Sequence, residues 1–343
     1  QRWLKFDLLP GQSSQERTYL GGLLSLLSLF LAFCLLFAEF SDYMTVTVDN
    51  QLVVDTDRHD QMEIRFNITF PRLPCAFMSI DALDIAGTVQ LDVNSTVYKQ
   101  RLDTRGGRIR KTMEPEETKL QSEMQLEAKK DDVPVPQNVN GCGTCYGAES
   151  ATRKCCETCE DIRQAYREKG WSFSNARNMA QCINEGYMEK LLAQKNEGCR
   201  IFGSVSVDQV GGNFHISPGT SYATAHGHFH DTSTFDYDQE FDLSHEIHSL
   251  SFGDDSYLGH TNPLDGMKRN TDAKNSLYQY FIKIVPTSII KQNGVVLETN
   301  QYSTTKHYQA VGSAHDQEKL PGVFFIYDLS PIQVVYRETS QSW

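Results

Sequence analysis

The sequence predicts a mainly β protein, in which a β-sandwich carries a cysteine-rich helical insertion and is preceded by one transmembrane helix. Three observations predict this fold class. Residues 20–38 are free of charge and proline, and this length is close to the ~20 residues that a helix needs to cross a bilayer. Two later parts of the chain alternate apolar and polar residues, as half-buried strands do. Between these parts, residues 138–199 hold seven of the nine cysteines.

The charges beside the apolar run predict its orientation. Arg2, Lys5 and Arg17 precede the run, and only acidic charges follow it up to Arg58. Because basic residues favour the cytoplasmic side, we expect a cytosolic N-terminus and a lumenal or extracellular main domain. A cleaved signal peptide is the alternative, with Leu36 and Ala38 as a weak cleavage site, but its apolar region would be shorter, at ~7–15 residues.

The strand pattern occurs on both sides of the cysteine-rich part. In the first half we expect strands at 45–48, 51–54 and 62–70. Asn293-Gly294 between apolar runs is a strong hairpin signal in the second half. The further expected strands of the second half are 199–207, 213–217, 278–285, 289–299 and 323–335. The simplest architecture is one sandwich assembled from both halves.

The chain therefore divides into six expected segments. We expect helices at 160–169 and 178–196, ended by Gly170 and Gly198, inside the insertion. Residues 101–137 are rich in charge and poor in apolar side chains, which predicts a solvated helix or a linker. The segments are a cytosolic segment at 1–18, a transmembrane helix at 19–40, the first lumenal sandwich part at 41–100, a charged linker at 101–137, the insertion at 138–199, and the second sandwich part at 200–343.

Eight cysteines lie beyond the membrane run, an even number on the oxidising side, so we expect disulfides. They are Cys75, Cys142, Cys145, Cys155, Cys156, Cys159, Cys182 and Cys199. A pair between Cys182 and Cys199 would anchor the second insertion helix to the next strand. Zinc held by the two C-x-x-C pairs is a second interpretation, and thiol–disulfide exchange through Cys142/Cys145 or Cys156/Cys159 is a third. The glycosylation sequons at Asn67 and Asn94 agree with an exposed, lumenal surface.

Residues 226–230 read His-Gly-His-Phe-His. On an extended strand, the imidazoles of His226, His228 and His230 would share one face, roughly 7 Å apart. Their ordinary pKa of ~6.5 makes pH sensing a hypothesis, with His215 as a fourth candidate. Strand histidines bonded to neighbours such as Asp231 are the structural alternative, and a metal site is the third. Tyr146, Trp171 and Phe173 are candidates for an apolar binding surface, or else for a local core around the disulfides.

Known enzyme signatures do not occur in the sequence. It contains no Gly-x-Ser-x-Gly, phosphate-binding glycine loop or His-Glu-x-x-His, and the adjacent Ser244, His245 and Glu246 would point to different sides. We therefore expect no catalytic residues and no cofactor. The net charge of −12 disfavours nucleic acid as a partner, whereas the apolar run makes the lipid bilayer one.

Many segments resemble the endoplasmic reticulum–Golgi intermediate compartment protein 3 family. They run in the same order from the membrane helix to the end of the chain. The segments are 74–87 (PCAFMSIDALDIAG), 100–103 (QRLD), 142–149 (CGTCYGAE), 155–161 (CCETCED), 211–215 (GGNFH), 226–231 (HGHFHD), 250–254 (LSFGD), 262–265 (NPLD), 320–323 (LPGV) and 332–335 (IQVV).

The resemblance implies a cargo-sorting receptor and not an enzyme. Members are expected to have two membrane spans and a lumenal β-sandwich, and to cycle between endoplasmic reticulum and Golgi in coated vesicles. The implied partners are a smaller related subunit in a hetero-oligomer, lumenal cargo proteins, and the vesicle coat, which binds cytosolic tails. Cargo capture is expected to favour the more acidic Golgi lumen. This sequence lacks a second span, so we expect it to be trimmed at both ends. A lumenal thiol–disulfide exchange protein remains the alternative function.

Overall fold

A computed structural model describes residues 19–55, 61–87, 96–109, 116–118, 133–138, 141–224, 227–232, 240–254, 261–270, 273–311 and 320–340. Four sequence-based expectations lie wholly or partly outside these residues: the cytosolic segment at 1–18, the glycosylation site at Asn94, the charged linker at 101–137 and the histidine at position 226.

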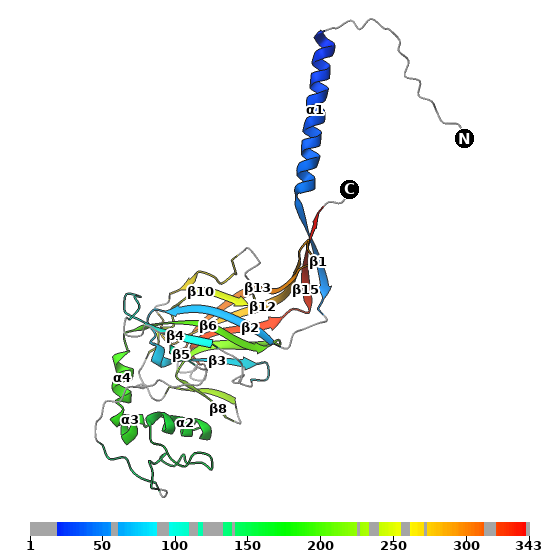
Figure 1. Ribbon diagram of the computed structural model, residues 1–343. Coiled ribbons are helices and arrows are strands. Elements are labelled where there is room, and N and C mark those ends of the chain that lie inside the picture. Colours follow the sequence, from blue (N-terminus) through cyan, green and yellow to red (C-terminus); the bar gives the residue numbers. More distant parts are fainter. Residues whose placement is uncertain are drawn as a thin grey trace.

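The transmembrane helix is α1, Tyr19–Met44. It is four residues longer than the expected 19–40, and its 26 residues are long and apolar enough to cross a membrane. Its side chains are exposed, as those of a helix in lipid are. α1 leads directly into β1 (Val46–Val54), which pairs antiparallel with β15 (Ile332–Ser340). The beginning and the end of the folded part therefore lie together beside the foot of α1 (Figure 1).

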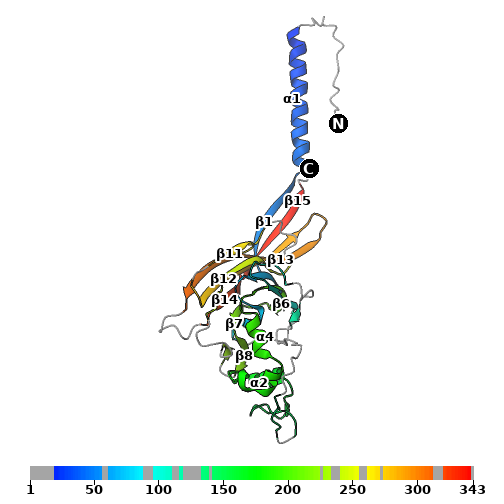
Figure 2. The same ribbon diagram turned by 90° about the vertical axis from the view of Figure 1, so that its left-hand side faces the viewer.

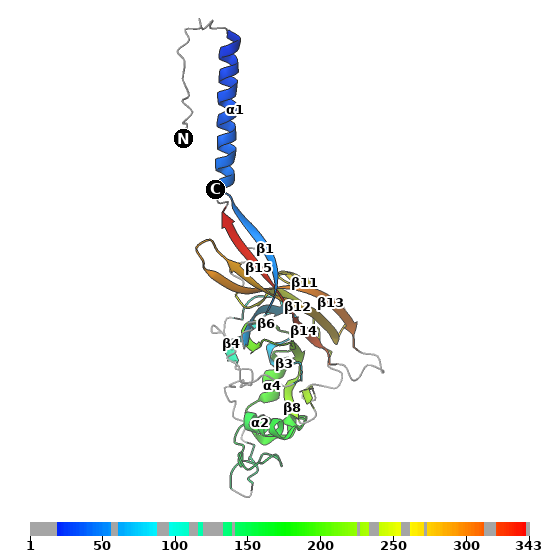
Figure 3. The same ribbon diagram turned by 90° about the vertical axis from the view of Figure 1, so that its right-hand side faces the viewer.

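Two sheets form the sandwich, and each takes strands from both halves of the sequence (Figures 2 and 3). The first sheet has the order β1, β15, β12 (Ser276–Ile290), β14 (Gly322–Leu329), β7 (Gly212–Pro218) and β3 (Met78–Asp84), with β13 (Val296–Ala310) on the other edge of β12. The second has the order β11 (Met267–Arg269), β10 (His245–Phe252), β2 (Gln61–Phe70), β6 (Gly198–Asp208), β4 (Thr96–Leu102) and β5 (Glu116–Thr118).

Alternating side chains form the core between the sheets. Every second residue of β2 from Met62 to Phe70 is buried, as its pattern predicts. The rings of Phe66 in one sheet and Phe214 in the other lie 4.7 Å apart, and Phe214 stacks on Phe325 at 5.6 Å. The expected sandwich built from both halves is confirmed.

The insertion lies at the end of the domain opposite α1 (Figure 1). Its helices are α2 (Cys159–Lys169), α3 (Ala180–Asn184) and α4 (Tyr187–Ala193), with a 3-10 turn, η2, at Ala176–Asn178. The first matches expectation: Thr158 caps its start in a capping box with Asp161, and Gly170 ends it in the left-handed conformation. The second expected helix, 178–196, is broken because Gly186 adopts φ 62° between α3 and α4.

Strand boundaries differ from the sequence-based expectation in several places. The expected strands 45–48 and 51–54 form the single strand β1, and the expected strand 323–335 divides into β14 and β15. The Asn293-Gly294 turn does join a hairpin, but β13 continues to Ala310 instead of ending near 299. Its far half is mostly exposed and polar, so it shows no apolar alternation. The expected linker at 101–137 also contributes to the second sheet. Its first two residues end β4, and its residues 116–118 form β5, which pairs with β4. Alternation requires one buried and one solvated face, so a strand exposed on both faces, like the far half of β13, does not show it.

Candidate functional site

Four disulfides hold the membrane-distal part together. Cys142–Cys155 and Cys145–Cys156 join the same two short segments side by side, and Cys159–Cys182 joins the start of α2 to α3. Cys75–Cys199 connects the short helix η1 (Cys75–Phe77) to β6 at the base of the insertion. All eight cysteines beyond the membrane helix are thereby paired, and Cys34 in α1 is free.

This pairing bears on three expectations, of which thiol–disulfide exchange stays a hypothesis. The Cys182–Cys199 pair is wrong, because Cys182 lies against the start of α2 whereas Cys199 lies next to η1. Neither C-x-x-C motif forms an internal disulfide. Cys142 bonds to Cys155 and Cys145 bonds to Cys156, while Cys159 bonds to Cys182. The thiolates that zinc would need are oxidised in this structure, so the two motifs do not form a zinc site.

A buried glutamine connects the disulfide segments to the helices. The Gln181 side-chain amide is buried and donates to the carbonyls of Thr144 (3.0 Å) and Cys156 (2.9 Å). Its carbonyl accepts a hydrogen bond from the Tyr146 hydroxyl at 3.1 Å, and that hydroxyl accepts one from the Ala180 N–H at 2.9 Å. Tyr146 is therefore a structural residue of the insertion.

The expected apolar surface of Tyr146, Trp171 and Phe173 is not one patch. Phe173 is only 4% exposed and packs against Tyr166 and Tyr187. Trp171 is 45% exposed and lies with its ring edge-on to Tyr166, at 5.6 Å. The interpretation as local core fits Phe173 and Tyr146, which leaves Trp171 as the exposed member of the three.

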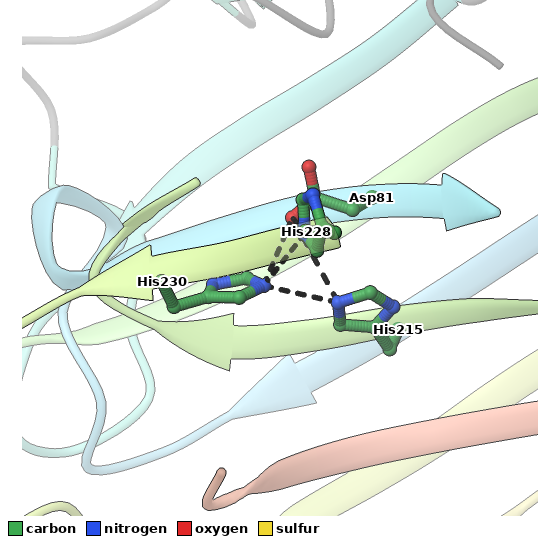
Figure 4. Close-up of side chains that lie close together, drawn as sticks. All are labelled: Asp81, His215, His228 and His230. Atoms are coloured by element: carbon green, nitrogen blue, oxygen red, sulfur yellow. Dashed lines mark hydrogen bonds and ion pairs between the residues drawn. The ribbon is translucent and has the colours of Figure 1, made fainter. Parts of the chain in front are cut away.

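A second group of polar residues lies where the sandwich meets the insertion. Asp81 on β3 and His215 on β7 are direct cross-strand partners. The chain leaves β7 into a hairpin of β8 (Thr220–Thr224) and β9 (Gly227–Asp231), and His228 and His230 of β9 point at the other two side chains (Figure 4). We call Asp81, His215, His228 and His230 the histidine–aspartate cluster.

The cluster is compact and buried. The Nε2 atom of His230 lies 3.0 Å from the Nε2 atoms of both His215 and His228. Asp81 Oδ2 lies 3.5 Å from Nε2 of His230, 3.6 Å from that of His228 and 4.0 Å from that of His215. The side chains are at most 8% exposed, and His228 is the most accessible. Sequence reasoning placed the histidines together but missed Asp81, which is more than 130 residues away in the chain.

Burial changes the protonation of the cluster. Burial, together with the neighbouring imidazoles, lowers the pKa of His215 to about 3 and that of His230 to about 4, although Asp81 opposes the shift. Burial alone would raise the pKa of Asp81, but contact with His228 and the charges of the three histidines outweigh it and lower this pKa to about 2. Both shifts move His215 and His230 below the ordinary histidine range. pH sensing by the histidines stays a prediction. Asp231, the partner expected for the histidines, instead accepts hydrogen bonds from Ser172 and the Phe173 N–H of the insertion.

The glycosylation candidate Asn67 lies on the outer face of β2, between β6 and β10. It is half-buried, and its carbonyl oxygen accepts a hydrogen bond from Arg200 Nε at 2.8 Å. Its modification stays a prediction.

The fold and these sites define a membrane-anchored β-sandwich protein with a disulfide-linked tip far from its membrane helix. Residues 5–91 match the family profile described as Endoplasmic Reticulum-Golgi Intermediate Compartment, and residues 145–343 match that of the endoplasmic reticulum vesicle transporter. The chain belongs to this endoplasmic reticulum–Golgi intermediate compartment family, which confirms the resemblance seen in the sequence.

Three relatives illustrate the range of similarity. A probable endoplasmic reticulum-Golgi intermediate compartment protein 3 of Dictyostelium discoideum is 38% identical over 99% of this chain and 87% of its own length. From Saccharomyces cerevisiae, the ER-derived vesicles protein ERV46 is 34% identical (95% of this chain, 86% of its own) and ERV41 is 27% identical (98% and 83%). The chain is therefore similar to proteins of early secretory vesicles, a family of trafficking proteins rather than enzymes.

Proposed function

We propose that this protein is a membrane cargo receptor that cycles between endoplasmic reticulum and Golgi and retrieves or sorts lumenal proteins. The observation that carries the proposal is the placement of its parts: both ends of the folded domain lie at the membrane helix, and the insertion lies at the far end (Figure 1). A surface in that position meets soluble proteins before any other part of the domain does. Four disulfides keep this surface rigid, which lowers the entropy that is lost when a partner binds.

The orientation and the partners follow from the same proposal. The N-terminus faces the cytosol and the β-sandwich faces the lumen, because the basic residues precede α1 and the disulfides need an oxidising compartment. The protein works in a hetero-oligomer with a smaller related subunit. The similarity of the chain to both ERV46 and ERV41 supports this proposal. Its cytosolic tails contact the vesicle coat.

Secretion of resident proteins tests the receptor function. In cells that lack this protein, we expect mass spectrometry to find resident endoplasmic reticulum proteins in the medium, above all those without a carboxy-terminal retrieval tetrapeptide. The full-length protein should restore their retention. Trp171→Ala should restore it only in part, because an indole that is 45% exposed at the tip offers a large apolar contact.

Ile85→Ala is the matched control for that variant. Ile85 is 84% exposed and follows β3 of the sandwich, so its loss also removes an exposed apolar side chain. Ile85→Ala should restore full retention. Unchanged secretion in cells that lack the protein would overturn the receptor function, whereas equal rescue by Trp171→Ala would remove Trp171 from the cargo surface.

A further inference from the structure

We propose that Asp81, His215, His228 and His230 form a binding site for a divalent transition-metal cation, for which Zn²⁺ is the best fit. The site uses none of the cysteines, and it does not depend on the receptor function proposed above. Three observations support it: the spacing of the four ligand atoms, the hydrogen bonds on the far side of two imidazoles, and a buried carboxylate oxygen without a hydrogen-bond partner.

The spacing matches a tetrahedral ion. Zinc bonds of ~2.0–2.1 Å to nitrogen and oxygen place neighbouring ligand atoms of a tetrahedron ~3.3 Å apart. The five measured separations between the Nε2 atoms and Asp81 Oδ2 run from 3.0 to 4.0 Å, and all four atoms lie within 4.8 Å of one another. Figure 4 shows the four side chains converging from three strands. Sub-ångström adjustments would complete the coordination.

The outer hydrogen bonds leave nitrogen lone pairs directed into the cluster. His215 Nδ1 lies 2.8 Å from Asn213 Oδ1, a carbonyl oxygen that can only accept, so the proton of this ring is on Nδ1. Ser79 Oγ lies 2.9 Å from Nδ1 of His230 and 3.4 Å from the Ser217 carbonyl, so the Nδ1–H tautomer of His230 lets this hydroxyl accept from the ring and donate to the carbonyl. Both Nε2 atoms then carry lone pairs only 3.0 Å apart. Such partners on the outer nitrogen are typical of histidines that bind metals.

Three neutral imidazoles cannot satisfy this arrangement with their own protons. A proton on Nε2 of His228 can be donated to His230, 3.0 Å away, but then Nε2 of His215 still faces a second lone pair. Asp81 Oδ2 is buried and has no hydrogen-bond partner among the described residues. A buried carboxylate is costly unless a positive charge or donors compensate it. One divalent cation would compensate the carboxylate and accept all three lone pairs.

The donor set selects the metal class. Three imidazoles and one carboxylate suit zinc and its neighbours among the first-row transition metals, whereas Mg²⁺ and Ca²⁺ prefer oxygen ligands. Four protein ligands fill a tetrahedron and leave no position for substrate, so the site is structural and not catalytic. The metal would fasten the β8–β9 hairpin to β3 and β7. Asp231, next to His230, binds Ser172 and Phe173, so the same hairpin also holds the insertion.

Metal binding by the purified full-length protein tests the proposal. After treatment with a chelator, removal of the chelator and addition of Zn²⁺ followed by desalting, we expect one Zn²⁺ per chain by elemental analysis, a higher Tm than the metal-free protein, and the visible absorption of tetrahedral Co²⁺ when Co²⁺ is added instead of Zn²⁺. Mg²⁺ should reproduce none of these effects. His228→Gln should weaken Zn²⁺ binding by at least ~100-fold, more than the ~10–100-fold that is typical for loss of an outer partner. His228 is the most exposed of the four side chains, so its replacement disturbs folding least.

Two further variants separate binding from folding. His248→Gln is the matched control: this histidine lies on β10 with its side chain 36% exposed, outside the cluster, and should bind Zn²⁺ like the wild type. Asn213→Ala keeps every ligand and removes only the acceptor for His215, so it should fold and bind ~10–100-fold more weakly. A wild-type protein without stoichiometric Zn²⁺, or a folded His228→Gln protein with unchanged affinity, would overturn the site.

Discussion

The sandwich and the insertion are stabilised by different interactions. In the sandwich, alternating apolar side chains from two sheets pack against one another, and the hydrophobic effect supplies most of the stability. The insertion has short helices, and its buried side chains, such as Ile162 and Phe173, continue the hydrophobic core of the sandwich. Three disulfides between its own segments add covalent links to this packing. The insertion therefore depends on covalent links as well as on burial, whereas the sandwich depends mainly on burial.

The largest expected effect is in the sandwich core. Phe214→Ala removes a fully buried ring between Phe66 and Phe325, which should lower the free energy of unfolding by about 3–5 kcal/mol. Denaturant unfolding followed by far-ultraviolet circular dichroism measures this loss. Phe281→Ala, at a ring that is 43% exposed on β12, is the control and should lower stability much less. Equal effects of the two substitutions would contradict the assigned core.

Removal of one disulfide should affect the insertion alone. The Cys159–Cys182 bond closes a segment with a separation of 23 residues, for which loop-closure entropy predicts about 3 kcal/mol. In the Cys159→Ser/Cys182→Ser protein we expect Trp171 fluorescence to change at lower denaturant than in the wild type. The circular dichroism transition of the sheets should stay where it was. If both signals shift together, the two regions unfold as one unit and their comparison as separate regions fails.

The smallest effect concerns the link between the regions. Asp231→Ala removes the carboxylate that accepts hydrogen bonds from Ser172 and from the Phe173 N–H, and bonds to a charged group contribute about 1.5–3 kcal/mol. Hydrogen–deuterium exchange should become faster around Phe173 and remain unchanged in β2. As a control, Asp328→Ala removes an exposed carboxylate that pairs with Lys283. If exchange around Phe173 does not change, Asp231 does not hold the insertion.

Several features could be predicted from local sequence. The apolar run, the alternation in β2 and the Asn293-Gly294 hairpin each depend on residues close together in the chain, and the structure has all three. The capping residue Thr158 and the helix-ending Gly170 act within one helical turn. The break at Gly186 could also have been suspected, because glycine inside a helical pattern is a common point of interruption.

Other features depend on which side chains the fold brings together, in some cases across more than a hundred residues. The sequence by itself determined an anchored β protein with an even set of cysteines, because periodicity, hydropathy and composition are local properties. Only the tertiary structure decided which cysteines pair and that Asp81 joins the histidines. It also decided that burial lowers the pKa of His215 and His230. Pairing and pKa both depend on which side chains become neighbours away from water, and sheet topology sets those neighbours.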